Sequence, residues 1–141
     1  AVTGGKGGGG KSNLTLGLAI CMALQGKKGM VLDADLGLAN VDVMLGIRSK
    51  RNLGQVLAGE CELKDAIVEG PYGIKIIPAP SGTQSMTELS HALHAGLIRA
   101  FGSLEDEMVI LLIDTAAGIS DMVISFSLPA HDVVVEFCAE P

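Results

Sequence analysis

The sequence predicts an α/β fold, a three-layer sandwich built around a mostly parallel sheet. Short apolar runs alternate with helix-like stretches along the chain, which is the rhythm of βα units. The composition agrees, since 48% of the residues are hydrophobic, 19 are glycine and only 3% are aromatic. Such a composition suits buried strands of aliphatic residues joined by tight loops. A length of 141 residues fits one domain, so we expect a single domain over residues 1–141.

The pattern of apolar residues places each expected element along the chain. Strands are expected at residues 1–3, 30–32, 74–78, 108–113 and 133–138, and helices at residues 12–25, 53–57, 63–68, 89–101 and 119–128. Loops are expected at residues 4–10, 36–42 and 79–86. The polar residues that are candidates for binding or catalysis follow directly after the expected strands. In open parallel sheets ligands bind at that edge.

Charge and cysteine usage restrict the classes of function. The formal net charge of −6 makes the domain a poor non-specific binder of DNA or anionic lipid, because phosphate contacts need Lys and Arg. No uninterrupted apolar run reaches the roughly 18 residues of a membrane helix, and no signal peptide is visible, so we expect a cytoplasmic protein. Cys21, Cys61 and Cys138 are far apart. They fit small buried hydrophobic residues in a reducing compartment.

A glycine-rich loop is the most specific motif in the chain. Residues 5–12 read GKGGGGKS, which matches G-x-x-x-x-G-K-[ST] between a strand and a helix. Glycines allow successive backbone N–H groups to surround phosphate oxygens, and the helix adds its positive end. Lys11 is expected at the β- and γ-phosphates and Ser12 on Mg²⁺, so ATP and Mg²⁺ are the expected cofactors. The expected nucleotide-binding residues of the loop are Gly5, Lys6, Gly7, Gly8, Gly9, Gly10, Lys11 and Ser12.

Three aspartates follow two of the expected strands. Asp33 and Asp35 are two positions apart, so on an ideal strand they face the same side. Asp114 follows the apolar run at residues 108–113, which is the Walker B arrangement, and its carboxylate is expected to hold magnesium through water. Gly118 completes D-x-x-x-G, where a backbone N–H can sense a γ-phosphate.

The early lysine of the loop points to one group of P-loop NTPases. The pattern KGGxGK[ST] resembles the "deviant" Walker motif of the MinD/ParA ATPases, which are P-loop NTPases of the SIMIBI type. Gly9 stands where that family usually has Val. The resemblance implies that Lys6 crosses a dimer interface to the partner's nucleotide. It also implies that Asp33 holds water in the Mg²⁺ shell and that Asp35 positions or activates the attacking water.

The site residues expected on these grounds fall into three sets. Asn40, in the loop that looks like the first switch, is an expected water or phosphate contact. The expected catalytic residues are Asp35, Lys6 and Lys11, and the expected metal ligands are Ser12, Asp33 and Asp114.

Four longer segments, at residues 33–46, 80–86, 89–101 and 114–121, resemble the FlhG/FleN branch of flagellar-number regulators. That resemblance implies a slow, partner-stimulated ATPase that dimerises with ATP and regulates flagellum number or placement. The implied partners are the SRP-like GTPase FlhF, flagellar switch components and a flagellar transcription activator. The implied location is the cytoplasm, peripherally at the inner membrane or cell pole. The polar residues 82–85 are either an ordinary turn or a partner surface.

The chain departs from this family in its last segment. Glu136 lies in an expected strand where the family has an apolar run, and a buried carboxylate there is costly unless it is paired or at an edge. Pro129 stops a helix that the family usually continues. We expect a fragment that lacks the start of the first strand and, beyond Pro141, the base-binding segment and the amphipathic membrane helix of the family.

Three other functions fit parts of the pattern. A ParA-like partitioning ATPase would bind DNA as an ATP dimer, but the acidic balance opposes this function. An iron–sulfur carrier of the same fold needs cysteines at the dimer face, and none lies between Cys61 and Cys138. A nucleotide-binding fragment without turnover is the third alternative.

Overall fold

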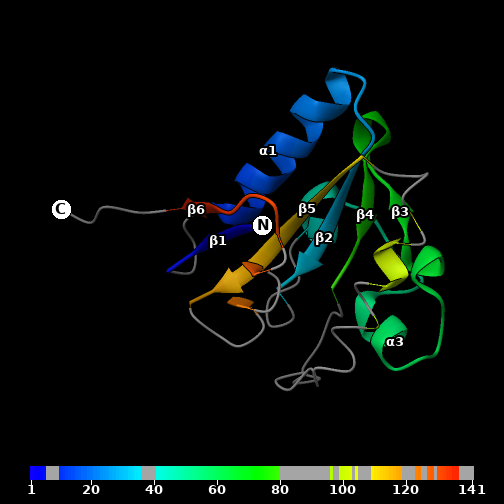
Figure 1. Ribbon diagram of the computed structural model, residues 1–141. Helices are drawn as coiled ribbons and strands as arrows, with labels where there is room; N and C mark the ends of the chain where they lie inside the picture. Colours follow the sequence, from blue (N-terminus) through cyan, green and yellow to red (C-terminus); the bar gives the residue numbers. More distant parts are fainter. Residues whose placement is uncertain are drawn as a thin grey trace.

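The computed structural model describes residues 1–5, 10–35, 41–79, 96, 99–102, 104, 109–118, 123–124, 127–128 and 130–136. The strands described form one six-stranded sheet in the order β3-β4-β2-β5-β1-β6 (Figure 1). They are β1 (Val2–Gly4), β2 (Gly29–Ala34), β3 (Val68–Glu69), β4 (Lys75–Ile77), β5 (Ile110–Ala117) and β6 (Val134–Glu136). All pairs are parallel except β3 with β4. The predicted mostly parallel α/β sheet is therefore confirmed.

Two apolar clusters pack against opposite faces of the sheet, because successive strand residues point to opposite sides. The described helices are α1 (Lys11–Leu24), α2 (Val41–Leu45), α3 (Leu53–Leu57), and the 3₁₀ helices η1 (Leu63–Ala66) and η2 (Pro71–Gly73). On one face Leu16 and Ala19 of α1 pack with Val31 of β2. On the other face Leu53 of α3 packs with Leu32 of β2. Figure 1 shows α1 and α3 on opposite sides of the sheet.

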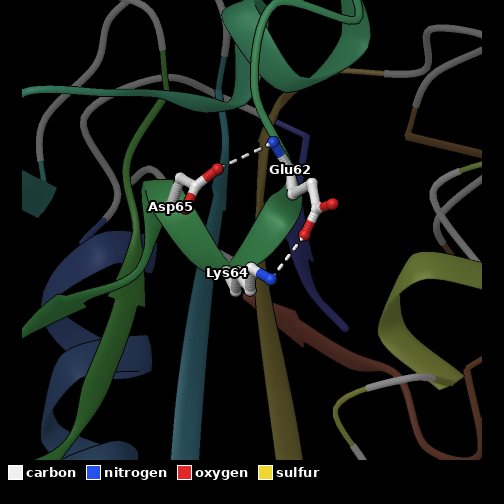
Figure 2. A network of polar contacts seen from close by, with 3 residues as sticks. All are labelled: Glu62, Lys64 and Asp65. Carbon is white, nitrogen blue, oxygen red and sulfur yellow. Dashed lines mark hydrogen bonds and ion pairs between the residues drawn. The ribbon is translucent and has the colours of Figure 1, made fainter.

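The segment predicted as a helix at residues 63–68 is shorter than expected. Residues Leu63–Ala66 form η1, and the chain then enters the antiparallel strand β3, so the prediction was wrong for the last two residues. The Glu62 backbone N–H donates to Asp65 Oδ2 at 3.0 Å, which supports the first turn of η1. Lys64 Nζ lies 2.7 Å from Glu62 Oε2 (Figure 2). That ion pair is exposed and contributes little to stability.

Other boundaries also differ from the prediction. β5 continues through Asp114 to Ala117 instead of ending at residue 113, and β2 contains Asp33. Parallel pairing of these two strands is unbroken from Gly29 with Ile110 to Ala34 with Thr115. Ala117 of β5 pairs with Gly4 of β1. The expected helices 89–101 and 119–128 lie mostly outside the described residues. None of the helices in the described parts of the chain combines the length and apolar character needed to cross a membrane.

Two glycine-to-alanine substitutions are expected to have opposite effects on stability. A Cβ on Gly70 would lie 2.6 Å from Ile76 Cδ1 and 3.0 Å from Ile74 Cγ1, and both isoleucines are buried. We expect Gly70→Ala to lower the free energy of unfolding by about 1–3 kcal/mol. Gly17 lies in α1 with open space at its Cβ position. Gly17→Ala is expected to raise that free energy by about 0.5–1 kcal/mol. Denaturant unfolding of both variants measures the difference, and equal midpoints would contradict this packing of Gly70 against Ile74 and Ile76.

Candidate functional site

The strand register brings five backbone positions, on four strands, to one region of the sheet. Asp114 of β5 is paired with Asp33 of β2 on one side and with Val2 of β1 on the other. Gly4, the last residue of β1, is paired with Glu136, the last residue of β6. Paired positions on neighbouring strands present their side chains to the same face. Asp33 and Asp114 therefore share one face of the sheet.

The start of α1 is built to receive an anion. Gly10 precedes the helix in a left-handed conformation, with φ 95°, which a glycine adopts without strain. The helix has no side-chain N-cap among the described residues, and its first turn contains no acidic residue. Its first N–H groups are therefore available to an anionic ligand, and the helix dipole favours negative charge there. Lys11 adds a positive charge while only 7% of its surface is exposed.

The carboxylate of Asp114 lies directly beneath this helix start. Asp114 is 1% exposed, and Thr15 Oγ1 lies 3.4 Å from its Oδ1. The same hydroxyl donates to the Lys11 carbonyl at 2.8 Å, and the Ser12 side chain also lies close to the Asp114 carboxylate. Burial raises the pKa of Asp114 above its ordinary value, as does the nearby Asp35, while Ser12, Lys11 and Thr15 oppose this shift.

One oxygen of Asp114 provides a test of the metal site expected from the sequence. Asp114 Oδ2 is buried and has no hydrogen-bond partner within the described parts of the chain. An unsatisfied buried carboxylate oxygen is costly, but it is a suitable ligand for a hard cation. The Ser12 hydroxyl at the same carboxylate supplies a second oxygen. Magnesium is held by few protein oxygens together with water and phosphates, so these residues fit Mg²⁺.

Asp33 has a second role that the sequence did not predict. The backbone N–H of Asp35 donates to its Oδ1 at 3.1 Å, and the N–H of Val41 donates to its Oδ2 at 3.2 Å. The buried carboxylate thus joins the residue that follows β2 to the first residue of α2. The sequence analysis expected residues 36–42 to be a loop. Val41 and Asp42 are instead helical, because this contact supports the first turn of α2.

Five of the predicted site residues are brought together. These residues are Lys11, Ser12, Asp33, Asp35 and Asp114, while Gly5 and Gly10 lie on either side of the central loop residues. Lys6, Gly7, Gly8, Gly9 and Asn40 lie outside the described residues, so their roles stay predictions. Thr15 was missed by the sequence analysis. Its position three residues after Ser12, on the same face of a helix, is the signal that could have found it.

The Gly118 N–H, predicted to sense a γ-phosphate, is engaged elsewhere in this structure. It donates to the carbonyl oxygen of Gly4 at 3.0 Å. Gly118 has φ 90°, which permits the turn that brings the end of β5 back to the end of β1.

With this geometry established, comparison with known proteins identifies the class. Residues 1–127 match the family model described as the CobQ/CobB/MinD/ParA nucleotide binding domain. The chain belongs to this family. Its fold, its glycine loop and its buried aspartate are therefore those of a nucleotide-binding domain.

Two curated relatives and one solved structure narrow the comparison. The chain is 55% identical over its whole length to the antiactivator FleN of Pseudomonas aeruginosa, covering 50% of that protein. It is 38% identical to the flagellum site-determining protein YlxH of Helicobacter pylori, with 96% of the chain and 46% of YlxH covered. A structure of the septum site-determining protein MinD of Pyrococcus horikoshii, complexed with Mg-ADP, superimposes with a TM-score of 0.82 at 28% identity, covering 96% of this chain and 55% of that one. The chain thus spans about half the length of these relatives.

Replacing Asp114 tests whether its buried charge is costly without a ligand. We expect Asp114→Asn to stabilise the nucleotide-free protein at pH 7 by roughly 1 kcal/mol, because it removes a buried and incompletely paired charge. The pKa of Asp114 is raised on folding. In the pH window between the ordinary pKa of an aspartate and this raised pKa, the folded state therefore binds more protons than the unfolded state. Wild-type stability should therefore fall, relative to the variant, as pH rises through that window. Thermal unfolding in EDTA at several pH values measures this difference.

The control for this experiment is Asp42→Asn, at an aspartate of α2 outside the described site. It should shift stability little and without the same pH dependence. A destabilised Asp114→Asn protein at pH 7 would contradict the assignment of an unsatisfied carboxylate.

Proposed function

We propose that this chain binds ATP with Mg²⁺ and forms part of an ATP-dependent switch that regulates flagellum number or placement. The observation that carries the proposal is the buried Asp114 carboxylate, with one unsatisfied oxygen, beneath the uncapped start of α1. Similarity to FleN and YlxH supports the flagellar assignment. The Mg-ADP complex of the MinD of Pyrococcus horikoshii supports the choice of cofactors.

Each site residue has a proposed role in binding the nucleotide or its metal. Lys11 and the first N–H groups of α1 bind the phosphates, and Gly5 and Gly10 begin and end the loop segment around them. Ser12 and Asp114 would hold Mg²⁺, and Asp33 would contact a water bound to it. The metal supplies positive charge that neutralises the phosphate oxygens. Among the loop residues outside the described parts, Gly7, Gly8 and Gly9 give backbone contacts and Asn40 contacts water or phosphate.

Hydrolysis depends on positioning more than on covalent chemistry. Asp35 orients the water that attacks the terminal phosphate, and Lys6 reaches the nucleotide of the second subunit in an ATP-dependent homodimer. Turnover is slow and is accelerated by a partner protein, because intrinsic hydrolysis without an added charge is slow in this class.

The partners are flagellar proteins, namely an SRP-like GTPase of the FlhF type, switch components or a flagellar transcription activator. The switch acts in the cytoplasm and peripherally at the inner membrane or cell pole. We expect no direct contact with nucleic acid, since the net charge of the chain is −6.

Light scattering of the complete protein that carries this chain tests the dimer switch. The protein carries Asp35→Ala to slow hydrolysis, and its mass is compared in Mg-ADP and Mg-ATP. We expect the mass to double in Mg-ATP, because the nucleotide of one subunit is contacted by Lys6 of the other.

Lys6→Ala in the same Asp35→Ala background is the matched control. It should bind ATP but remain monomeric. A protein that binds ATP and stays monomeric with Lys6 intact would rule out the dimer switch while leaving nucleotide binding in place.

A further inference from the structure

Glu136 places a carboxylate beside the phosphate-binding lysine. It is the last residue of β6, its side chain is partly buried, and it is paired with Gly4. A Cβ on Gly4 would lie 2.9 Å from Glu136 Oε2 and 3.2 Å from Lys11 Cδ. The two side chains therefore meet above the same glycine. Glu136 Oε2 and Lys11 Cδ each lie about 3 Å from the position of a Cβ on Gly4, so these two atoms are at most about 6 Å apart.

The position of Glu136 explains how the strand tolerates a charge. β6 is at the edge of the described sheet, next to β1 alone. The preceding residues Val134 and Val135 are exposed. An edge position leaves the carboxylate partly solvated, and Gly4 leaves room for it because glycine has no side chain. The charge that the sequence analysis identified as costly is thus accommodated at an edge.

Lys11 is the group on which this carboxylate acts. Its side chain is almost fully buried, and a buried ammonium group is stable only with nearby anions. The ammonium nitrogen of Lys11 is two bonds beyond Cδ, so it lies at most about 9 Å from Glu136 Oε2. At that separation in a partly buried site, the interaction of two charges changes a binding equilibrium on the order of tenfold. A nucleotide phosphate that approaches Lys11 is attracted by the lysine and repelled by Glu136.

We propose that Glu136 is an affinity-determining residue of the nucleotide site, an internal counter-ion that competes with the nucleotide phosphates for Lys11. The inference rests on the proposed function, since it assumes that Lys11 binds phosphate. The carboxylate balances the lysine in the empty site and weakens binding of nucleotides whose β-phosphate reaches Lys11. A nucleoside monophosphate lacks that phosphate and is not subject to this competition.

Calorimetric titration of the complete protein with Mg-ADP and with AMP tests the competition. Glu136→Gln keeps the shape of the side chain and removes its charge. We expect the Kd for Mg-ADP to fall about tenfold and the Kd for AMP to stay unchanged. Glu69→Gln is the matched control, because Glu69 is an exposed glutamate on β3 at the opposite edge of the sheet. It should change neither constant.

Glu136→Val provides a second variant, which also removes the charge and suits a strand. We expect the same fall in the Kd for Mg-ADP, so the test remains possible even if the Glu136→Gln variant does not fold. Equal Kd values for wild type and the Glu136 variants, or weaker binding by the variants, would overturn the competition and leave nucleotide binding intact. Absence of binding by all forms would instead refute the proposed function, and this inference with it. Binding by the variants alone would support the competition.

Discussion

The contact between Asp114 and the first turns of α1 is the interaction on which the site depends. β5 lies between β2 and β1 in the sheet, so the level of Asp114 is fixed by parallel pairing on both sides. Thr15 and Ser12 reach this carboxylate from α1. The contact thereby holds the helix start over the sheet edge, where ligands of parallel sheets bind. The raised pKa of Asp114 is the electrostatic cost of this arrangement.

Charge balance favours binding of the proposed phosphate ligand together with a metal. Asp33, Asp35, Asp114 and Glu136 bring four carboxylates to the region around Lys11. A polyphosphate adds further negative charge to this region. The helix start offsets about half a charge, which is too little on its own. A divalent cation held at Asp114 makes the carboxylates and the phosphates compatible, so metal and nucleotide should bind with positive coupling.

The sequence predicted what depends on local patterns and missed what depends on register. Apolar runs and the glycine loop were sufficient to predict the parallel sheet, α1 and the grouping of Lys11, Ser12 and Asp114, because parallel strands end at one edge. The contact of Thr15 with Asp114 joins residues 99 positions apart, and no periodicity reports such a distance. The start of α2 was missed for a similar reason, since its first N–H is satisfied by Asp33 of β2. An antiparallel β3 of two residues is too short to show alternation.

Gly4 shows how one position can link several parts of such a site. Its carbonyl accepts the N–H of Gly118 at the end of β5, and its missing side chain leaves room for both Lys11 and Glu136. The end of β1 therefore contacts the segment that follows Asp114, the side chain of Lys11 and the last strand. A nucleotide that displaces Glu136 from Lys11 would change the packing on one side of Gly4, while Gly118 is bonded on the other. Gly4 therefore connects the surroundings of Lys11 with the backbone that follows β5.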